Sequence, residues 1–222
     1  MHAAFEAILD LAFPARCPGC GLEGEPVCRG CRPRLSVRAE MPGGVPIGMA
    51  SATPPPLLQL EWCAPYQGVV RAALHELKYG GETRVAVPLG EAVAERWAAA
   101  GVGAEAIVPV PVHPERRRRR GYDQAELIAR AASARLGLPL APLLVRRRAT
   151  VAQYELDRVH RAANVRDAFG LASRAAARAT RDRWLLLVDD VATTGSTLGA
   201  CAETLLAAGA AGVSAITVAR ER

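Results

Sequence analysis

Apolar and polar positions follow two different periods along this chain, and the changes between them predict its elements. From Glu61 onward, stretches with apolar residues three and four positions apart, typical of helices, are interleaved with short apolar runs typical of buried strands. The helical pattern covers 68–79, 85–100, 124–136 and 197–208. The strand pattern covers 106–112, 143–146, 184–189 and 213–219. This interleaving predicts βαβ units, and hence an α/β fold with a mostly parallel sheet flanked by helices.

The first part of the chain follows neither period after Pro14. The residues before it are apolar but include Glu6 and Asp10, which favours an amphipathic helix over a signal peptide. Residues 41–58 are rich in Pro, Gly and small side chains and carry hardly any charge, as linkers do. We therefore expect a small module over 1–40 that begins with this helix, a linker over 41–58 and a main domain over 59–222.

Composition excludes several classes of protein. The chain has 222 residues, of which 50% are hydrophobic and 23% charged, and this composition is globular rather than disordered or collagen-like. Its apolar runs are strand-length, so no membrane-spanning segment is expected. Lys and Arg number 28 against 22 acidic residues, giving a net charge of +6. Arginine runs at 116–120 and 146–148 could hold phosphates or nucleic acid, or could form an ordinary solvated face.

Four of the six cysteines form a metal-binding pattern. Cys17, Cys20, Cys28 and Cys31 have the spacing C-x2-C-x7-C-x2-C. Two C-x2-C turns can bring four thiolates to one tetrahedral ion, so the pattern favours a structural Zn²⁺ in a small zinc-ribbon-like module over free thiols or a redox pair. The other two cysteines stand alone on a predicted strand and helix and are expected to be buried thiols. With no export signal, we expect a reducing, cytoplasmic location.

The strand predicted at 184–189 ends in two adjacent carboxylates. After Asp189 and Asp190 come a short loop of Thr, Gly and Ser and then an amphipathic helix. In an open α/β sheet the carboxyl end of a strand is where ligands bind, and amides at a helix N-terminus favour a phosphate. Two acids would repel a bare anion but could accept hydrogen bonds from a sugar diol that carries the phosphate. The alternative is an ordinary capped helix, which leaves the acid pair unexplained.

The segment VDDVATTGST resembles the signature for 5-phosphoribosyl 1-pyrophosphate in type I phosphoribosyltransferases. Nearly the whole chain resembles the ComF family, in which a zinc module precedes a phosphoribosyltransferase domain. The resemblance extends through LHELKYGGE, IVPVPVHPERRRRRGYDQAELIA and the segment 153–169. It implies a type I phosphoribosyltransferase-like fold for the main domain.

The resemblance also implies roles for individual residues. Residues expected to act in catalysis are Asp189 and Asp190 on the ribose hydroxyls, Arg120, and Arg158 in a flap that closes over the substrate. The rest of the expected flap contacts are Gln153, Arg161 and Asn164. A pyrophosphate loop would include Pro111 and His113, and Lys78, the sole lysine of the chain, could reach a phosphate. The 5′-phosphate would be bound by Val191, Ala192, Thr193, Thr194, Gly195, Ser196 and Thr197.

Two functions follow from this resemblance. In the first, the protein binds the phosphoribosyl donor with Mg²⁺ and transfers the phosphoribosyl group to a nitrogen acceptor, in connection with DNA uptake during natural transformation. In the second, it keeps the fold but acts as a single-stranded-DNA-binding or coupling protein of the competence machinery, and the arginine runs and the net charge favour such contacts. The sequence names neither the acceptor nor the oligomeric state.

Overall fold

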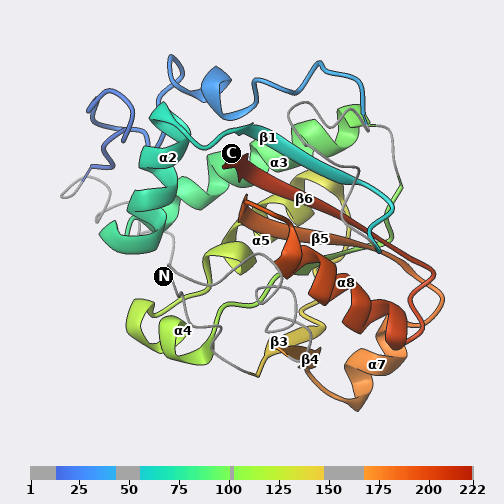
Figure 1. Ribbon diagram of the computed structural model, residues 1–222. Coiled ribbons are helices and arrows are strands. Elements are labelled where there is room, and N and C mark those ends of the chain that lie inside the picture. Colours follow the sequence, from blue (N-terminus) through green and yellow to red (C-terminus); the bar gives the residue numbers. More distant parts are fainter. Residues whose placement is uncertain (1–13, 44–55, 101–102, 148–167, 222) are drawn as a thin grey trace.

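A four-stranded parallel sheet forms the centre of the protein (Figure 1). The computed structural model describes residues 14–43, 56–100, 103–147 and 168–221. In the sheet the strands lie in the order β1 (Leu60–Pro65), β6 (Gly212–Arg220), β5 (Trp184–Ala192) and β2 (Ala106–Pro109). Each neighbouring pair is parallel. The predicted α/β fold with a mostly parallel sheet is therefore confirmed.

Helices cover both faces of this sheet, because its central strands are apolar on both sides. Along β5, Leu186 and Val188 enter one hydrophobic core, whereas Leu185 and Leu187 enter a second. The first core is covered by α2 (Gly68–His75), α3 (Ala86–Ala100) and α5 (Gln124–Leu136). The second is covered by α7 (Arg174–Thr180) and α8 (Ser196–Ala207). The result is a three-layer arrangement (Figure 1).

Most predicted elements are present, with shifts that have local causes. The strand expected over 106–112 ends at Pro109, because Pro109 and Pro111 have no N–H to donate to a ladder. Strand β5 is longer than expected and runs past the acid pair. The strand expected at 143–146 is β3 (Leu144–Arg146), and it pairs antiparallel with β4 (Phe169–Leu171) in a separate two-stranded sheet.

The helix expected over 68–79 changes its geometry before it ends. The α-helical part stops at His75, and a π-helical turn, η2 (Glu76–Gly80), continues it. This turn contains Lys78 and closes at Gly81, whose φ of +74° is readily adopted only by glycine. Single π turns inside helices are often found at functional sites.

One helix was not expected from the pattern. The arginine run 116–120, for which we predicted neither a helix nor a strand, lies in α4 (Pro114–Arg120). The helix begins after His113 with a proline in its first turn and ends at Gly121, whose φ is +84°. A run of arginines has no apolar periodicity, so only these end signals could have predicted it. Short 3₁₀ turns, η1 (Arg32–Leu35) and η3 (Thr83–Val85), complete the described elements.

The cysteine-containing segment packs against the sheet and its helices. Cys17, Val27, Cys31 and Leu35 belong to the first core together with residues of α2 and α3. The segment leads into a chain that runs beside β1, where the backbone N–H of Arg38 donates to Cys63. The expected N-terminal helix and residues 44–55 of the expected linker lie outside the described residues, and the domain boundaries stay a prediction.

A buried ion cluster holds this chain in place. The fully buried Arg96 of α3 donates two hydrogen bonds to Glu61 of β1, at 3.0 and 2.6 Å. The same guanidinium donates to the backbone carbonyls of Arg38, Met41 and Pro42. Since unpaired buried charges are costly, this cluster specifies where residues 38–42 lie on the main fold.

Candidate functional site

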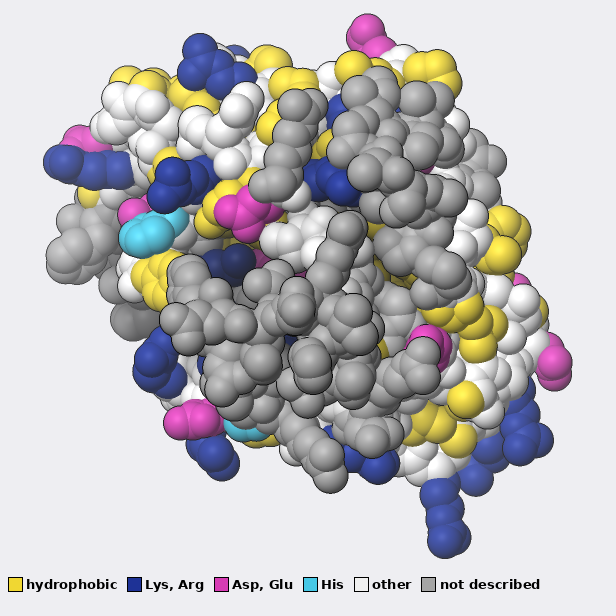
Figure 2. Space-filling view, viewed as in Figure 1, with side chains coloured by type: hydrophobic (Ala, Val, Ile, Leu, Met, Phe, Trp, Pro, Cys, Tyr) yellow, Lys and Arg dark blue, Asp and Glu magenta, His cyan; other side chains and the backbone are white. Residues whose placement is uncertain are grey.

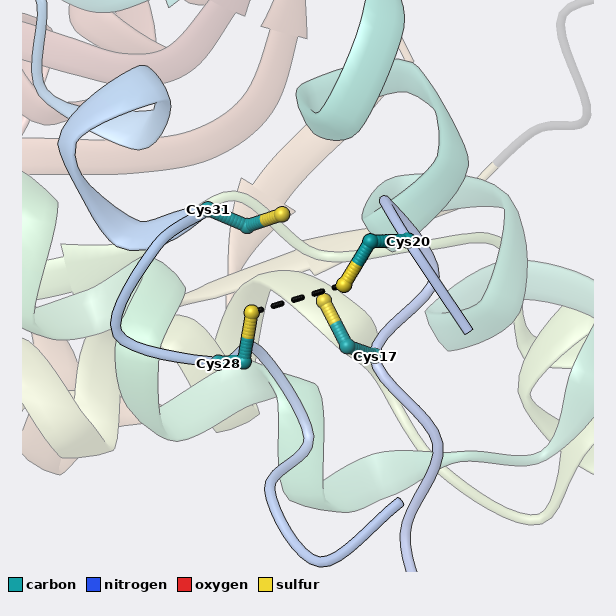
Figure 3. A group of neighbouring side chains, drawn as sticks. All are labelled: Cys17, Cys20, Cys28 and Cys31. Atoms are coloured by element: carbon teal, nitrogen blue, oxygen red, sulfur yellow. Dashed lines mark hydrogen bonds between the residues drawn. The ribbon is translucent and has the colours of Figure 1, made fainter. Parts of the chain in front are cut away.

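The four cysteine side chains point toward one another (Figure 3). Cys17 and Cys20 come from one turn, and Cys28 and Cys31 from the other; their sulfur atoms all lie within 4.8 Å of one another. Zn–S bonds of about 2.3 Å in a tetrahedron would place the sulfurs about 3.8 Å apart. The cluster can therefore hold a metal ion, and the thiol chemistry of the set suits Zn²⁺.

Local backbone geometry helps to position the cysteines of this cluster. Gly21, with a φ of +78°, allows the first turn to close through a hydrogen bond from its N–H to the carbonyl of Cys17. Burial raises the pKa of the Cys17 thiol, but hydrogen bonds to its sulfur from the backbone of Cys28, Gly19 and Cys20 outweigh burial and lower the pKa to about 6. Amides aimed at a sulfur stabilise the thiolate that a metal requires.

The two remaining cysteines lie elsewhere, as expected. Cys63 on β1 and Cys201 on α8 are both fully buried. Burial raises the pKa of each thiol, so both stay protonated at neutral pH. The prediction of two buried structural thiols is confirmed.

A second candidate site lies at the carboxyl edge of the sheet. Strands β2 and β5 are parallel neighbours, with Pro109 paired with Val188. The loop after β2 and the loop after β5 therefore leave the sheet side by side. The acid pair ends the buried part of β5, and α8 begins four residues after Ala192. This edge brings together residues that are about eighty positions apart in the chain.

Asp190 is neutralised by the sole lysine of the sequence. Its side chain is buried, and its Oδ2 lies 2.5 Å from Nζ of Lys78 in the π turn. The side-chain amide of Gln124, on α5, lies 3.5 Å from the same oxygen. Burial lowers the pKa of Lys78, but the charges of Asp190 and Asp189 outweigh burial and raise it. Lys78 is therefore an ammonium ion at neutral pH.

Asp189 has different surroundings. It keeps partial exposure, and its Oδ1 accepts a hydrogen bond of 2.8 Å from the backbone N–H of Asp190. Burial, and next the negative charge of Asp190, raise the pKa of Asp189 well above its ordinary value. Its charge acts on the pKa values of Arg146 and Cys201 as well as on that of Lys78. The acid pair therefore consists of one paired carboxylate and one carboxylate open to a further partner.

The loop after β5 presents hydroxyls and helix amides. Gly195, with a φ of +79°, is the N-cap residue immediately before α8. Thr193 and Thr194 beside it are exposed. The hydroxyls of Thr194 and Ser196 are 2.8 Å apart. The first amides of α8, including that of Thr197, have no acceptor within the helix. Of the seven residues expected to bind the phosphate, Val191 and Ala192 still belong to β5.

The loop after β2 is fixed through its backbone. The N–H of Val112 donates to Oδ2 of Asp123 at 2.9 Å. Pro111 and His113, on either side, are half-buried. Nδ1 of His113 accepts from the N–H of Glu115 at 3.4 Å, so this side chain caps α4. His113 therefore already has a structural use in the free protein.

Arg120 connects α4 to the acid pair through a neighbour. It donates to Oε1 of Gln124 at 2.6 Å, and its guanidinium lies 5.3 Å from the ring centroid of Tyr79. The hydroxyl of Tyr122 donates to the carbonyl of Leu77 in the π turn. The sequence assigns no role to Gln124 or Tyr122. Their contacts with β5 and the π turn depend on the order of strands in the sheet, which their positions in the chain do not give.

The four other arginines of the run, 116–119, are exposed. This matches the expectation that some of the run is a solvated face. The expected flap residues Gln153, Arg158, Arg161 and Asn164 lie outside the described residues. Within the described ranges, no helix is both long and apolar enough to cross a bilayer.

Comparison with known proteins gives several relatives over most of the chain. The DNA utilization protein YhgH of Escherichia coli K12 is 31% identical over 175 residues, 76% of this chain and 75% of the relative. Its counterpart in Salmonella typhimurium is 30% identical over 203 residues, 89% of this chain and 80% of the relative. Competence protein F of Haemophilus influenzae is 42% identical over 95 residues, 42% of this chain and 41% of the relative. No family model matches.

Solved structures give more distant matches. One is described as the allosteric regulatory enzyme of purine biosynthesis, with 20% identity and a TM-score of 0.39 over 60% of this chain and 26% of that chain. Another is the glutamine phosphoribosylpyrophosphate amidotransferase of B. subtilis with ADP and GMP, with 20% identity and a TM-score of 0.40 over 60% of this chain and 27% of that chain.

Proposed function

This chain belongs to the ComF family, with the DNA utilization protein YhgH and competence protein F, and from that premise we propose that it binds 5-phosphoribosyl 1-pyrophosphate with Mg²⁺ and transfers its phosphoribosyl group to a nitrogen acceptor. One observation carries the proposal. The acid pair at the carboxyl end of β5 lies between an ammonium group and a hydroxyl-rich loop at a helix N-terminus. A sugar with two hydroxyls and a 5′-phosphate matches this order of groups.

In this proposal the ribose lies against the acid pair. Its 2′ and 3′ hydroxyls donate to Asp189 and Asp190, while the 5′-phosphate accepts from hydroxyls and amides between Thr193 and Thr197. Asp189 is open to a new donor, whereas Asp190 already accepts from Lys78. Binding at Asp190 therefore requires this carboxylate to share its oxygens or release the lysine.

Lys78 and Arg120 supply positive charge for the pyrophosphate. The side chain of Lys78 is 17% exposed. Its ammonium group can therefore rotate from Asp190 toward an incoming anion while the backbone stays in the π turn. Arg120, the last residue of α4, is held by Gln124 and offers a planar pair of donors that suits phosphate oxygens. In the 110–113 loop the N–H groups of Val110 and Val112 already donate to Val188 and Asp123, so the N–H of His113 would complete the pyrophosphate site.

Mg²⁺ fits this edge because carboxylate and phosphate oxygens are the ligands it prefers. Asp189 and Asp190 would hold it together with the oxygens of the donor, and when bound it would neutralise negative charge on the leaving group. In the transfer, the bond between C1 and the pyrophosphate oxygen breaks and its electron pair leaves with pyrophosphate. The lone pair of the acceptor nitrogen forms the new C1–N bond, and that nitrogen then loses a proton.

The metal of the cysteine cluster is proposed to be a structural Zn²⁺. Three of the four cysteines are buried, and they belong to the first core. All four ligand positions are taken by protein sulfurs, which leaves no open position for substrate.

Calorimetric titration of the zinc-loaded protein with the donor and Mg²⁺ tests the proposal. The wild type should bind with micromolar affinity, and the double variant Asp189→Asn, Asp190→Asn should lose at least ~100-fold. Asp182→Asn is the matched control, because Asp182 is exposed and its φ of +57° suits asparagine. Absence of binding to a folded wild type would contradict the proposal. Release of pyrophosphate with a panel of amines and nucleobases then tests transfer.

A second candidate function is binding of single-stranded DNA, and the arginines of α4 favour it. Figure 2 shows basic side chains over α4, at the lower left of the view. Burial, and then the nearby charge of Arg116, lower the pKa of Arg146, so α4 and β3 bring their arginines together. Such a surface suits a phosphate backbone. In this proposal DNA and other competence proteins are met in the cytoplasm.

Fluorescence anisotropy with a labelled oligonucleotide tests this second function. Changing Arg116, Arg117, Arg118 and Arg119 to Gln should weaken binding and lower its dependence on salt. Arg174→Gln and Arg178→Gln, exposed arginines on α7, are the controls. Equal affinity in both sets would contradict a DNA surface on α4.

A further inference from the structure

A buried carboxylate connects the loop after β2 to the start of α5. Asp123 is 6% exposed. Its Oδ1 accepts hydrogen bonds from the backbone N–H groups of Ala125 and Glu126, at 3.0 and 3.3 Å, and so caps α5. Its Oδ2 accepts from the N–H of Val112 at 2.9 Å. Both oxygens of one side chain are used, one for the helix and one for a loop eleven residues earlier.

A helix cap does not require the second of these bonds. Ser, Thr or Asn can cap a helix with one oxygen, whereas only a carboxylate offers two acceptor oxygens of this kind. Burying that carboxylate has a cost, since burial raises the pKa of Asp123 despite the three amides that lower it. The second acceptor oxygen, Oδ2, therefore serves to hold the backbone of Val112.

Val112 lies between Pro111 and His113, in the loop that the proposed function assigns to pyrophosphate. The residue after Asp123 is Gln124, whose side-chain amide faces Asp190. The N-cap of α5, Asp123, thus contacts the loop, and the first residue of the helix, Gln124, faces the acid pair. The loop and the acid pair are the two halves of the proposed donor site. A shift of this helix end would move the two halves relative to each other.

We propose that Asp123 is a positioning residue for the donor site, holding the 110–113 loop through Val112 so that the N–H of His113 faces the pyrophosphate. This inference rests on the proposed function, because it assigns no ligand of its own. It predicts an effect confined to ligands that carry pyrophosphate. Ribose 5-phosphate, which has the ribose and 5′-phosphate alone, should be unaffected by the position of this loop.

Two variants separate the loop contact from the helix cap. Asp123→Asn and Asp123→Ser both keep an oxygen that caps α5, and both remove the acceptor for Val112. In Asp123→Asn the side-chain NH₂ group would face the N–H of Val112, so two donors meet. Two variants of different size ensure that at least one can be studied if the other folds poorly. Asp182→Asn again serves as the control for loss of one carboxylate.

The measurement is calorimetric titration with three probes: 5-phosphoribosyl 1-pyrophosphate, pyrophosphate and ribose 5-phosphate, each with Mg²⁺, beside a thermal melt. We expect the first two to bind about tenfold more weakly to the Asp123 variants, with the affinity for ribose 5-phosphate within twofold of the wild type. A tenfold loss corresponds to about 1.4 kcal/mol, in the range of one lost hydrogen bond to a charged group.

The outcomes distinguish this inference from the function on which it rests. If the wild type binds ribose 5-phosphate and the donor, and the variants bind all three probes equally well, Asp123 has no positioning role. Equal losses for all three probes, with a lower melting temperature, would show a structural role alone and would overturn the inference. If the folded wild type binds no probe, the proposed function fails and the role of Asp123 fails with it.

Discussion

The cysteine cluster and the carboxyl edge of the sheet are two sites assembled in opposite ways. Every ligand of the cluster comes from one segment, 17–31, and two tight turns suffice to bring the sulfurs together. The carboxyl edge draws on the π turn, the loop after β2, the start of α5, the end of β5 and the start of α8. Local spacing specifies the first site, and the order of strands specifies the second.

The two sites also balance charge differently. Four thiolates would repel one another, so the cluster depends on a cation from outside. The acid pair carries its own counter-charge, because Lys78 contacts Asp190 directly. We therefore expect the cluster to lose its structure without metal, and the carboxyl edge to stay formed without ligand.

The largest effect should follow removal of the metal. Cys17→Ser with Cys28→Ser should release the metal and lower the melting temperature by about 10 °C or more, because metal binding stabilises a segment with little core of its own. Metal content by mass spectrometry and a thermal melt check this. Cys201→Ala, at a buried thiol outside the cluster, should keep one bound metal. A double variant that retains both its metal and its melting temperature would contradict the structural role.

Breaking the buried ion cluster should have the next largest effect. Arg96→Met leaves Glu61 buried without its main partner and should reduce the free energy of unfolding by about 3 to 5 kcal/mol. Denaturant unfolding measures it. The double variant Glu61→Gln, Arg96→Met also removes the buried carboxylate, whose remaining ion pair is with Arg38 at 3.5 Å, and should recover part of the loss. A single variant as stable as the wild type would show that this cluster does not hold residues 38–42.

Changing Lys78 should affect the carboxyl edge alone. Lys78→Met leaves Asp190 buried without a cation and should weaken donor binding about 100-fold, while the cluster keeps its metal. Lys78→Arg keeps the charge but not the compact ammonium group, so an intermediate loss is expected. Titration with the donor and metal analysis of the same samples check the two expectations, weaker donor binding and a retained metal. Loss of metal in Lys78→Met would contradict the independence of the two sites.

The smallest effect is expected at Tyr122. Tyr122→Phe removes the hydrogen bond to the carbonyl of Leu77, worth about 1 kcal/mol, and should weaken donor binding a few-fold by loosening the π turn. Tyr79→Phe is the matched control, because the side chain of Tyr79 is largely exposed. If the two variants bind the donor with equal affinity, the hydrogen bond of Tyr122 does not contribute to the donor site.

The sequence predicted what depends on short spacing. Helix α5 has the predicted bounds, the parallel sheet is present, and the four cysteines converge. It did not predict that Lys78 reaches Asp190, because this contact depends on which strands are neighbours, or that Asp123 reaches Val112, because this contact depends on how the chain folds back around α4. It also missed α4, whose arginines give no apolar period. Patterns specify elements and local sites, whereas contacts between distant segments require the fold.

Protection of Lys78 from chemical modification tests the central claim most directly, since this residue is the sole lysine of the chain. The protein, carrying Arg178→Lys on the opposite face as an internal reference, is treated with an amine-acylating reagent with and without 5-phosphoribosyl 1-pyrophosphate and Mg²⁺. Mass spectrometry of peptides gives the rate at each lysine. The account predicts at least tenfold slower modification at Lys78 with the donor and no change at the reference. Equal rates at Lys78 under saturating donor would contradict a donor site at this edge of the sheet.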